Sequence, residues 1–306
     1  MKIHVIVNPN AGKRIVQRNL EQIIGKLILD GTAESIRVTR TEKTKDATQA
    51  AAACTAADTD LIIGCGGDGT INEIVNGIME SGEDIPLAIL AAGTSNDFAS
   101  SLRLPDEPEE FCQMVRDAHY RRIDLGLANN GTYFVNVAAF GMFTNVAHTT
   151  NRNAKNTLGR LAYYLQAAAS VREQLVQVMP LEIEVDGEKL TGNFHLCLVV
   201  NSKSVATFRK LMEKADVSDG VFDILLMKKL NIFSSAAEIS NRILSGDFYK
   251  LPSIQYLQGK AITFQSPKNE DIEVDVDGEC FGTLPLTISV CHEAIRLMVP
   301  EASLTL

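Results

Sequence analysis

Short apolar runs alternate with longer amphipathic segments through about the first 128 residues of the chain. The runs have the length of buried strands, and between them apolar residues recur every three or four positions, as in a helix packed on one face. The expected strands are Lys2 to Val7, Ser35 to Thr39, Leu61 to Ile63, Leu87 to Leu90 and Arg121 to Gly126, and the expected helices include Ile15 to Leu29, Asp46 to Ala57 and Glu109 to Arg116. This alternation predicts a doubly wound parallel sheet, and we expect residues 1–128 to form one α/β domain.

The pattern changes near residue 129, where short strands and turns become dominant. The candidate strands are Tyr133 to Phe140, Leu181 to Val185, Asn193 to Val200, Val221 to Met227, Ile254 to Leu257, Ala261 to Phe264 and Ile272 to Val276. Helices are expected at 158–171 and 232–244. We therefore expect residues 129–293 to form a second, mainly antiparallel domain of β-sandwich type.

Glycines and small polar residues follow two of the expected strands. Gly66-Gly-Asp-Gly-Thr70 comes after one strand and opens a helix, and Gly93-Thr-Ser-Asn-Asp97 comes after the next. Such turns let the backbone approach a ligand closely, and a helix start offers N–H groups to an anion, so the pattern favours phosphate. Since a carboxylate repels phosphate, Asp68 is expected to face magnesium or its water shell. The alternative is that the glycines only make a tight turn and Asp68 caps the helix.

Three segments together resemble the nucleotide-binding motifs of the diacylglycerol kinase catalytic-domain family. They are Asn8-Pro-Asn-Ala-Gly-Lys13, Gly66 to Thr70 with Asn72-Glu73, and Gly93 to Phe98. Within that family the chain is most similar to the soluble bacterial lipid kinases, over nearly its whole length. The resemblance implies that the last strand and tail, about 294–306, return to the first domain. It also implies an ATP site made by Asn8, Asn10, Ala11, Gly12, Lys13, Thr41, Gly66, Gly67, Asp68, Gly69, Thr70, Asn72, Glu73, Gly93, Thr94 and Asn96.

Two of these residues have simpler interpretations. Lys13 is suited to contact a phosphate as a point charge, or it is a solvated loop lysine. Thr41 enters through the resemblance alone, because a polar stretch and Asp46-Ala47 follow it as in the family.

Asp124 lies between apolar residues of an expected strand. A buried carboxylate needs a partner or a cation, and a salt bridge to Arg121 or Arg122 would be enough. The resemblance implies instead that Asp124 completes a catalytic acidic cluster with Asp68 and Asp97.

An acidic turn, Asp216-Val-Ser-Asp-Gly-Val221, is a second candidate metal site. Two carboxylates and a carbonyl suit magnesium or calcium, although most turns of this kind are simply solvated. The resemblance implies a structural magnesium held by Asp216, Asp219 and the carbonyl of Val221.

The tetrapeptide Val-Asp-Gly-Glu occurs twice, ending at Glu188 and at Glu279. Asp-Gly between strands predicts a hairpin turn in both places. The family carries its proton-accepting glutamate near the C-terminus, so the resemblance assigns the catalytic base to Glu279 and leaves Glu188 without a role.

Composition limits the partners. The net charge of −9 argues against nucleic-acid binding and gives no general attraction to anionic membranes. No apolar run approaches the roughly 20 residues that cross a bilayer, and no signal-peptide core follows Met1, so a cytoplasmic protein is expected. The six cysteines are widely spaced and are expected to be reduced and mostly buried.

These observations favour an ATP- and magnesium-dependent kinase acting on diacylglycerol or a related membrane lipid, with peripheral membrane contact. The alternatives are a soluble-substrate kinase, because NAD kinases share the Gly-Gly-Asp-Gly-Thr core, and a nucleotide-binding regulatory protein without activity. Apolar residues that suit a lipid cleft, or simply the core, are Phe140, Met142, Phe143, Leu161, Tyr163 and Tyr164. A homodimer is compatible with the sequence.

Overall fold

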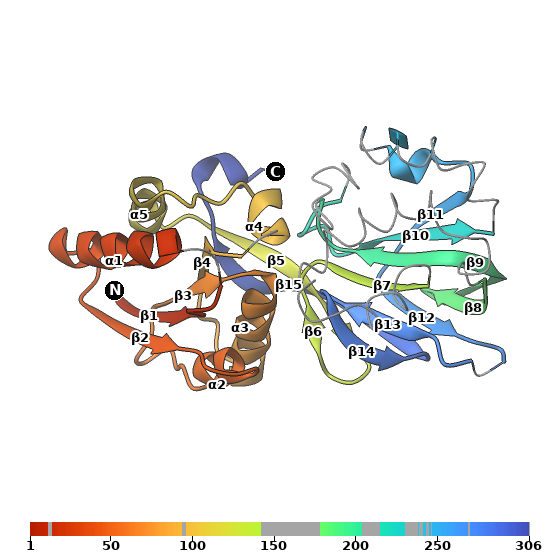
Figure 1. Cartoon of the computed structure of the whole chain (residues 1–306), viewed down its shortest axis with the longest axis horizontal. Helices are drawn as coiled ribbons and strands as arrows, with labels where there is room; N and C mark the ends of the chain where they lie inside the picture. The colour runs from red at the N-terminus through yellow and green to blue at the C-terminus, as the bar shows by residue number, and fades with distance from the viewer. Residues whose placement is uncertain are drawn as a thin grey trace. The chain divides into compact units, whose positions relative to one another are not determined.

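The computed structural model describes residues 1–11, 14–93, 96–141, 178–203, 215–229, 238, 241–242, 245, 247–268 and 270–305 (Figure 1). Contacts within the chain divide it into two compact units. The first comprises Met1–Leu125 and Glu293–Leu306, and the second comprises Gly126–His292. Among the described residues, no helix is long and apolar enough to cross a membrane.

The first unit contains a parallel sheet with the strand order β2-β1-β3-β4. The strands are β1 (Lys2–Val7), β2 (Ser35–Arg40), β3 (Leu61–Gly66) and β4 (Leu87–Ala91). The C-terminal end of β15 (Leu286–Met298) lies parallel to β4, with Leu297 opposite Leu87, and β5 (Tyr120–Ala128) pairs with β15. The central strands β3 and β4 are short and wholly buried or nearly so, as expected for strands covered on both faces, whereas the edge strand β2 is mostly exposed and carries two arginines.

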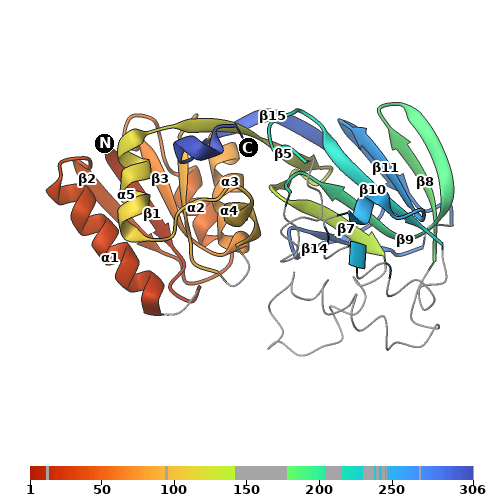
Figure 2. The same cartoon turned by 90° about the horizontal axis from the view of Figure 1, so that it is seen from above.

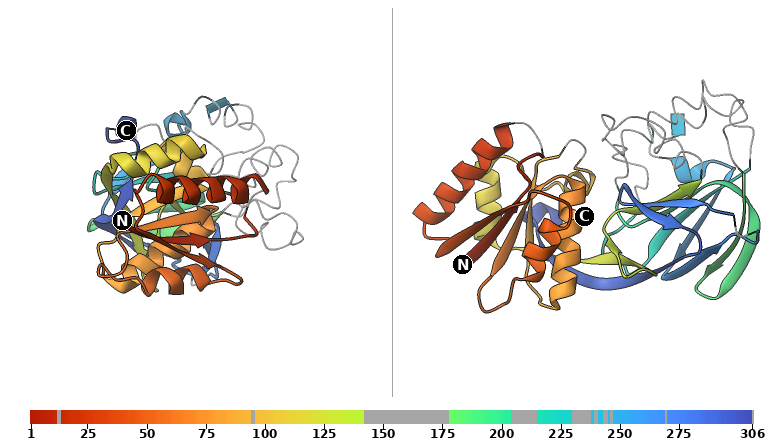
Figure 3. Two further views of the ribbon diagram at one scale, coloured as in Figure 1. Left: turned by 90° about the vertical axis from the view of Figure 1, so that its left-hand side faces the viewer. Right: turned by 60° about the horizontal axis from the view of Figure 1, so that its bottom comes forward.

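Helices cover both faces of this sheet, as Figures 2 and 3 show. The helices are α1 (Arg14–Leu29), α2 (Asp46–Ala52), α3 (Asp68–Ser81), α4 (Asp97–Ser101) and α5 (Pro108–Asp117). On one face, Ile23 and Leu27 of α1 and Phe111 of α5 pack into the strand core. On the other face, α2 packs on α3. The expected doubly wound fold is therefore confirmed.

The helix expected from Asp46 to Ala57 is shorter, because α2 ends at Ala52. Thr55 donates its N–H to Asp58 Oδ1 at 3.2 Å, and Asp58 donates its own N–H to the Thr55 carbonyl at 3.1 Å. Side chains of this type compete with the helix for backbone groups and favour a local turn. The alanine-rich composition alone therefore predicts the wrong C-terminal end for this helix.

The second unit is antiparallel, with the strand order β14-β13-β7-β9-β8-β12-β15 and with β10 and β11 joined through β9. The strands are β6 (Tyr133–Phe134), β7 (Val137–Gly141), β8 (Met179–Val185), β9 (Glu188–Val200), β10 (Phe222–Lys228), β11 (Ile254–Gly259), β12 (Ala261–Gln265), β13 (Glu273–Val276) and β14 (Glu279–Thr283). Two short 3-10 helices, Phe248–Lys250 and Glu301–Ser303, complete the described elements of the chain. Phe134, Phe140, Phe222 and Phe264 lie in one buried core of this unit, which has the expected antiparallel β-sandwich fold.

Some elements of this region differ from those expected. The strand expected from Tyr133 to Phe140 is interrupted after Phe134 and resumes at Val137. The last strand, β15, begins at Leu286 in the second unit, and the chain rejoins the first unit at Glu293, next to the return expected at about residue 294. The helix expected at 158–171 lies outside the described residues, and so does most of the one expected at 232–244.

Candidate active site

The first glycine loop joins β3 to α3. Gly67 precedes the helix with an extended backbone, and its carbonyl accepts the N–H of Ile71 at 3.1 Å. Asn8, which follows β1, donates its side-chain amide to Thr70 Oγ1 at 3.1 Å, and its N–H to the carbonyl of Cys65 at 2.9 Å. The loop after β1 is thus tied to the glycine loop after β3.

The second glycine loop touches the first. A Cβ placed on Gly93 would lie 2.5 Å from the Cα of Gly67, and one placed on Gly67 would lie 3.1 Å from the Cα of Gly93. The N–H of Ala92 also donates to the carbonyl of Gly66 at 2.8 Å. Only glycine at position 93 allows this approach, because real Cβ contacts do not reach 2.5 Å.

Asn96 holds the second loop in shape. It adopts a left-handed conformation with φ 50°, which asparagine tolerates better than most residues. Its Oδ1 accepts the N–H of Gly93 at 2.7 Å, and its Nδ2 donates to the carbonyl of Gly93 at 3.1 Å. The Asn96 side chain therefore binds both the N–H and the carbonyl of Gly93 and fixes the backbone where β4 ends.

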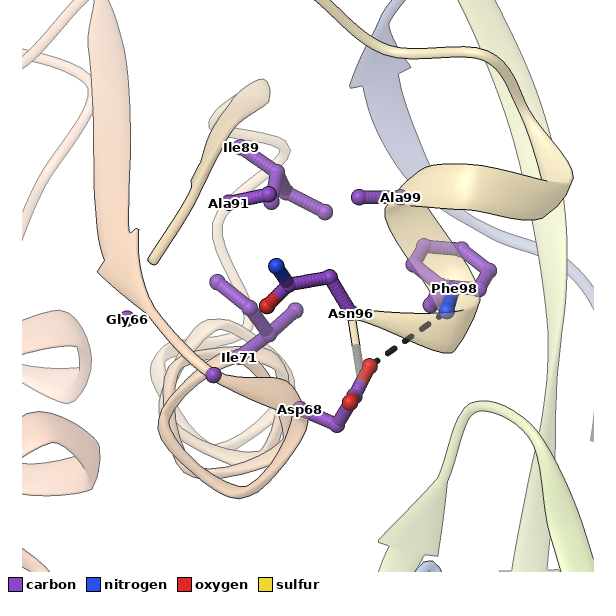
Figure 4. A pocket seen from close by; sticks show the side chains of 9 residues that line it. Gly66, Asp68, Ile71, Ile89, Ala91, Asn96, Phe98 and Ala99 are labelled. Carbon is purple, nitrogen blue, oxygen red and sulfur yellow. Dashed lines mark hydrogen bonds between the residues drawn. The ribbon is translucent and has the colours of Figure 1, made fainter. Parts of the chain in front are cut away.

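Asp68 is half-buried at the start of α3 and reaches the neighbouring loop. Its Oδ1 accepts the N–H of Phe98 at 3.3 Å, at the beginning of α4 (Figure 4). Burial raises the pKa of Asp68, and hydrogen bonds from the backbone at Phe98 and Asp97 oppose that rise. The alternative that Asp68 caps its own helix is wrong, because α3 has no side-chain cap among the described residues and the Asp68 carboxylate binds an N–H in the first turn of α4 instead.

A pocket of about 180 Å³, partly open to solvent, lies between these two loops (Figure 4). It is lined by Gly66, Gly67, Asp68, Ile71, Ile89, Ala91, Asn96, Phe98 and Ala99. Its polar groups come from the glycine loops and from Asp68, while its inner wall is apolar. The 180 Å³ includes space open to solvent, and the enclosed part has room for about one water molecule, so a phosphate group would have to lie at the open mouth beside the loops.

Other residues expected at the ATP site do not line this pocket; they follow β2 or lie in the first turns of α3. Thr41 is buried and donates its N–H to the carbonyl of Val7 at 2.9 Å. Glu73 Oε2 accepts the N–H of Ala47 at 3.3 Å, at the first turn of α2. Gly69 is exposed in the first turn of α3, and Asn72 follows it with its side-chain Oδ1 accepting from Asn76 at 3.0 Å.

In the loop after β1, Asn8 Oδ1 accepts the N–H of Asn10 at 3.0 Å, and the Asn8 carbonyl accepts the N–H of Ala11 at 3.1 Å. Gly12, Lys13 and Thr94 lie outside the described residues. These three assignments therefore stay predictions from the sequence.

Two further carboxylates of the expected acidic cluster are buried in the first unit. Asp97 begins α4, directly before the residue that donates to Asp68. Asp124 is fully buried in β5, and its Oδ1 accepts the N–H of Glu293 at 2.7 Å. Arg122 pairs with Asp84, while Arg121 donates to the carbonyl of Ser303.

The two Val-Asp-Gly-Glu copies form the same type of turn in the second unit. Asp186 and Asp277 have φ 49° and 48°, and the glycines that follow them have φ 90° and 87°. Both glutamates are exposed at the start of a strand, Glu188 in β9 and Glu279 in β14. Backbone conformation therefore does not distinguish them, but Asp277 is buried whereas Asp186 is exposed.

At the acidic turn, each aspartate already folds back on the backbone. Asp216 Oδ1 accepts the N–H of Ser218 at 3.0 Å, and Asp219 Oδ1 accepts the N–H of Val221 at 3.0 Å. Within the described residues, no group of three His, Cys, Asp or Glu side chains has the arrangement of a metal site. A metal here would therefore depend on backbone carbonyls such as that of Val221.

Of the residues considered for a lipid cleft, the structure describes Phe140, which is fully buried in the β-sandwich core with its ring centroid 4.8 Å from that of Phe264. It is a core residue. Met142, Phe143, Leu161, Tyr163 and Tyr164 lie outside the described residues.

Comparison with known proteins agrees with this architecture. A family model for the diacylglycerol kinase catalytic domain matches residues 2–128. The chain is 32% identical over 300 residues to a diacylglycerol kinase of Staphylococcus saprophyticus, covering 98% of this chain and 96% of the relative. The chain belongs to the diacylglycerol kinase family. The diacylglycerol kinase of Staphylococcus haemolyticus is 33% identical over 97% of this chain and 88% of its own.

The second half of the chain matches a model of the YegS C-terminal NAD kinase beta sandwich-like domain, over residues 136–299. Among solved structures, a candidate diacylglycerol kinase of Bacillus anthracis has a TM-score of 0.85 and 27% identity, covering 99% of this chain and 96% of that one. The diacylglycerol kinase fold therefore extends over both units of the chain.

Sequence reasoning missed one group of residues near Glu279. Asp277 was interpreted only as a turn residue, yet its buried carboxylate binds the backbone at Val135, Asn136 and Val137. These partners lie about 140 residues away in the sequence, so no local pattern could reveal them.

Proposed function

We propose that this protein is an ATP-dependent lipid kinase that transfers the γ-phosphate of ATP to the hydroxyl of diacylglycerol or a related membrane lipid. The product is phosphatidic acid or its analogue. The observation that carries this proposal is the contact between the glycine loops at Gly67 and Gly93. The contact joins two strand-to-helix loops into one backbone cradle at the start of α3, in a member of the diacylglycerol kinase family.

We assign the triphosphate to this cradle. Backbone N–H groups of the glycine loops and the start of α3 are suited to phosphate oxygens, and Lys13 would add a positive charge. Asn8, Asn10 and Thr70 form one hydrogen-bonded set beside the loop, which supports their assignment to the same site. We assign Thr41, Asn72 and Glu73 as further nucleotide contacts.

We assign Asp68, Asp97 and Asp124 to a divalent metal that would accompany ATP. Asp68 places a half-buried carboxylate at the rim of the pocket, and Asp97 and Asp124 are buried carboxylates of the same unit. Because no three such side chains among the described residues are grouped as a metal site, phosphate oxygens and water would complete the coordination. Magnesium in such a site neutralises negative charge on the transferred phosphoryl group. We assign a second, structural ion to Asp216, Asp219 and the Val221 carbonyl; chelation should lower the melting temperature of the wild type and leave an Asp219→Asn variant unchanged.

Glu279 is assigned as the general base. Its exposed carboxylate would take the proton from the lipid hydroxyl while the oxygen bonds to the γ-phosphorus, and the bond to the bridging oxygen breaks to release ADP. General-base help of this kind contributes roughly a hundredfold to ten-thousandfold in rate. The remaining barrier is lowered by orientation and charge neutralisation at the glycine cradle.

We further propose that the protein works at the inner face of the membrane as a peripheral protein. Diacylglycerol stays in the bilayer and ATP is in the cytosol, so the two substrates meet at that surface. Because the net charge is −9, contact must depend on a local patch rather than on attraction of the whole protein. A homodimer is compatible with this arrangement.

A substrate comparison tests the proposed function. The full chain is incubated with ATP and magnesium, in separate reactions, with diacylglycerol in mixed micelles, with a total lipid extract, and with NAD. Mass spectrometry should detect phosphatidic acid or another phosphorylated lipid, and no NADP. Phosphorylation of NAD alone would make the protein a soluble-substrate kinase, and binding of ATP without any product would make it a nucleotide-binding regulator.

A further inference from the structure

Asp277 makes four hydrogen bonds to one short backbone segment of the second unit. Its Oδ2 accepts the N–H of Val135 at 2.7 Å, and its Oδ1 accepts the N–H groups of Asn136 and Val137, both at 2.9 Å. The N–H of Asp277 donates in turn to the carbonyl of Val137 at 2.9 Å. This is the segment that interrupts the strand between β6 and β7, so the carboxylate satisfies N–H groups that a continuous ladder would otherwise pair.

The segment is also held from its other side. Asn201 donates its N–H to the carbonyl of Asn136 at 2.8 Å and its side-chain amide to the carbonyl of Val135 at 2.9 Å. Ser202 Oγ donates to Asn136 Oδ1 at 2.9 Å. Asn136, Asn201 and Ser202 are all buried. Buried polar networks of this kind fix a single geometry, because an alternative would leave polar groups unpaired.

Glu279 lies two residues after Asp277, on the exposed side of the same turn. The turn is closed by Gly278, whose N–H donates to Asp275 Oδ1 at 2.7 Å, and Glu279 lies opposite Val276 in the β13–β14 pair. The carboxylate of Glu279 is therefore carried by a two-residue turn whose first residue is anchored in the interior.

The other Val-Asp-Gly-Glu copy, which ends at Glu188, allows the contacts of Asp277 to be compared with those of Asp186. Asp186 also accepts backbone N–H groups, from Lys260 at 3.0 Å and Ala261 at 2.8 Å, but it does so on the surface. The two copies thus share their sequence, turn type and capping chemistry. They differ in the burial of the aspartate and in the network behind its acceptor segment.

We propose that Asp277 is a positioning residue for Glu279, and that its buried contacts with residues 135–137 set the place from which Glu279 removes a proton. The inference rests on the proposed function, because it requires Glu279 to be the base. A general base must be within hydrogen-bond reach of the proton, and a misplacement of about 1 Å can cost a hundredfold in rate. A buried carboxylate that accepts three N–H groups gives the turn this precision.

The test compares Asp277→Asn with Asp186→Asn in the full chain. Asparagine keeps the left-handed preference at both turns, but it replaces one accepting oxygen with an NH2 group that cannot accept. For D277N we expect kcat to fall about 10- to 100-fold while KM for ATP stays within about twofold. For D186N we expect both constants to stay within about twofold of the wild type.

A double variant distinguishes an effect of Asp277 on the position of Glu279 from a general loss of folded structure. If Asp277 acts through Glu279, D277N adds no further loss in an E279Q background. A further loss in the double variant, or unchanged kcat in D277N beside an impaired E279Q, overturns the inference and leaves the proposed function intact. An E279Q variant as active as the wild type overturns the assignment of the base itself.

If D277N does not fold, Ser202→Ala replaces it as the test. This substitution removes the hydrogen bond to Asn136 Oδ1 from the far side of the same network. We expect kcat to fall about threefold or more with KM for ATP unchanged, and the effect should vanish in the E279Q background. A loss that persists in that background overturns the inference.

Discussion

Gly67 and Gly93 meet at the point where two neighbouring strands end, with so little space that a Cβ on Gly93 would lie 2.5 Å from the Cα of Gly67. The two loops are thereby brought close enough to share a small pocket. Parallel strands place their carboxyl ends at one edge of a sheet, and this edge is where such folds bind ligands. Because Gly67 and Gly93 carry no side chains, the two loops at this edge can come into direct backbone contact and form one cradle.

Substituting Gly93 with alanine should therefore separate the loops. Because the added methyl group meets backbone atoms that cannot rotate away, we expect a loss of about 1–3 kcal/mol in the free energy of unfolding. We also expect at least a tenfold rise in KM for ATP, since the pocket itself is deformed. Urea denaturation and steady-state kinetics measure these two effects.

Gly25 provides the matched control. It lies within α1, and a Cβ there would meet nothing within 4 Å. Gly25→Ala should leave KM for ATP unchanged and stabilise the helix by about 0.5–1 kcal/mol. If G93A behaves like G25A, the contact between the loops has no part in ATP binding.

Asp68 leads to a prediction about pH. Burial raises the pKa of this carboxyl group, so the ionised form is disfavoured in the folded protein. A raised folded-state pKa means that the folded protein binds protons more readily, and this contribution to stability grows as pH falls. Asp68→Asn keeps an oxygen for the Phe98 N–H and removes the charge.

Without nucleotide or metal, D68N should therefore be more stable than the wild type at pH 7. The difference should shrink as pH falls through the pKa of Asp68, because the wild-type carboxyl becomes neutral as well. Urea denaturation at pH 7 and pH 4 measures this. A variant less stable than the wild type at pH 7 would mean that the charged carboxylate stabilises the two loops.

The alternation of apolar runs and amphipathic segments was sufficient to predict the parallel sheet and its helices. Each of those elements is decided by residues close together in the sequence. The end of α2 was wrong, because the turn made by Thr55 and Asp58 depends on hydrogen-bond geometry rather than on composition. Likewise the strand is interrupted after Phe134, where the N–H of Val135 donates to Asp277, far along the chain.

For the site, sequence motifs identified the glycine loops but not how they meet. The contact at Gly67 and Gly93, and the capping of α4 by Asp68, arise only when β3 and β4 lie side by side. The two Asp-Gly turns were correctly expected from local sequence, since the left-handed backbone at Asp186 and Asp277 is a local property. The burial of Asp277 is not a local property, and no local sequence pattern distinguishes Asp277 from Asp186.

The most direct test of the proposed mechanism uses the repeated tetrapeptide itself. Glu279→Gln and Glu188→Gln make the same change in the same turn, both at exposed positions. With magnesium, ATP and diacylglycerol, E279Q should reduce kcat by about 10²- to 10⁴-fold, and E188Q should stay within about twofold of the wild type. Equal kcat in E279Q and the wild type would contradict the assignment of Glu279 as the residue that accepts the lipid proton.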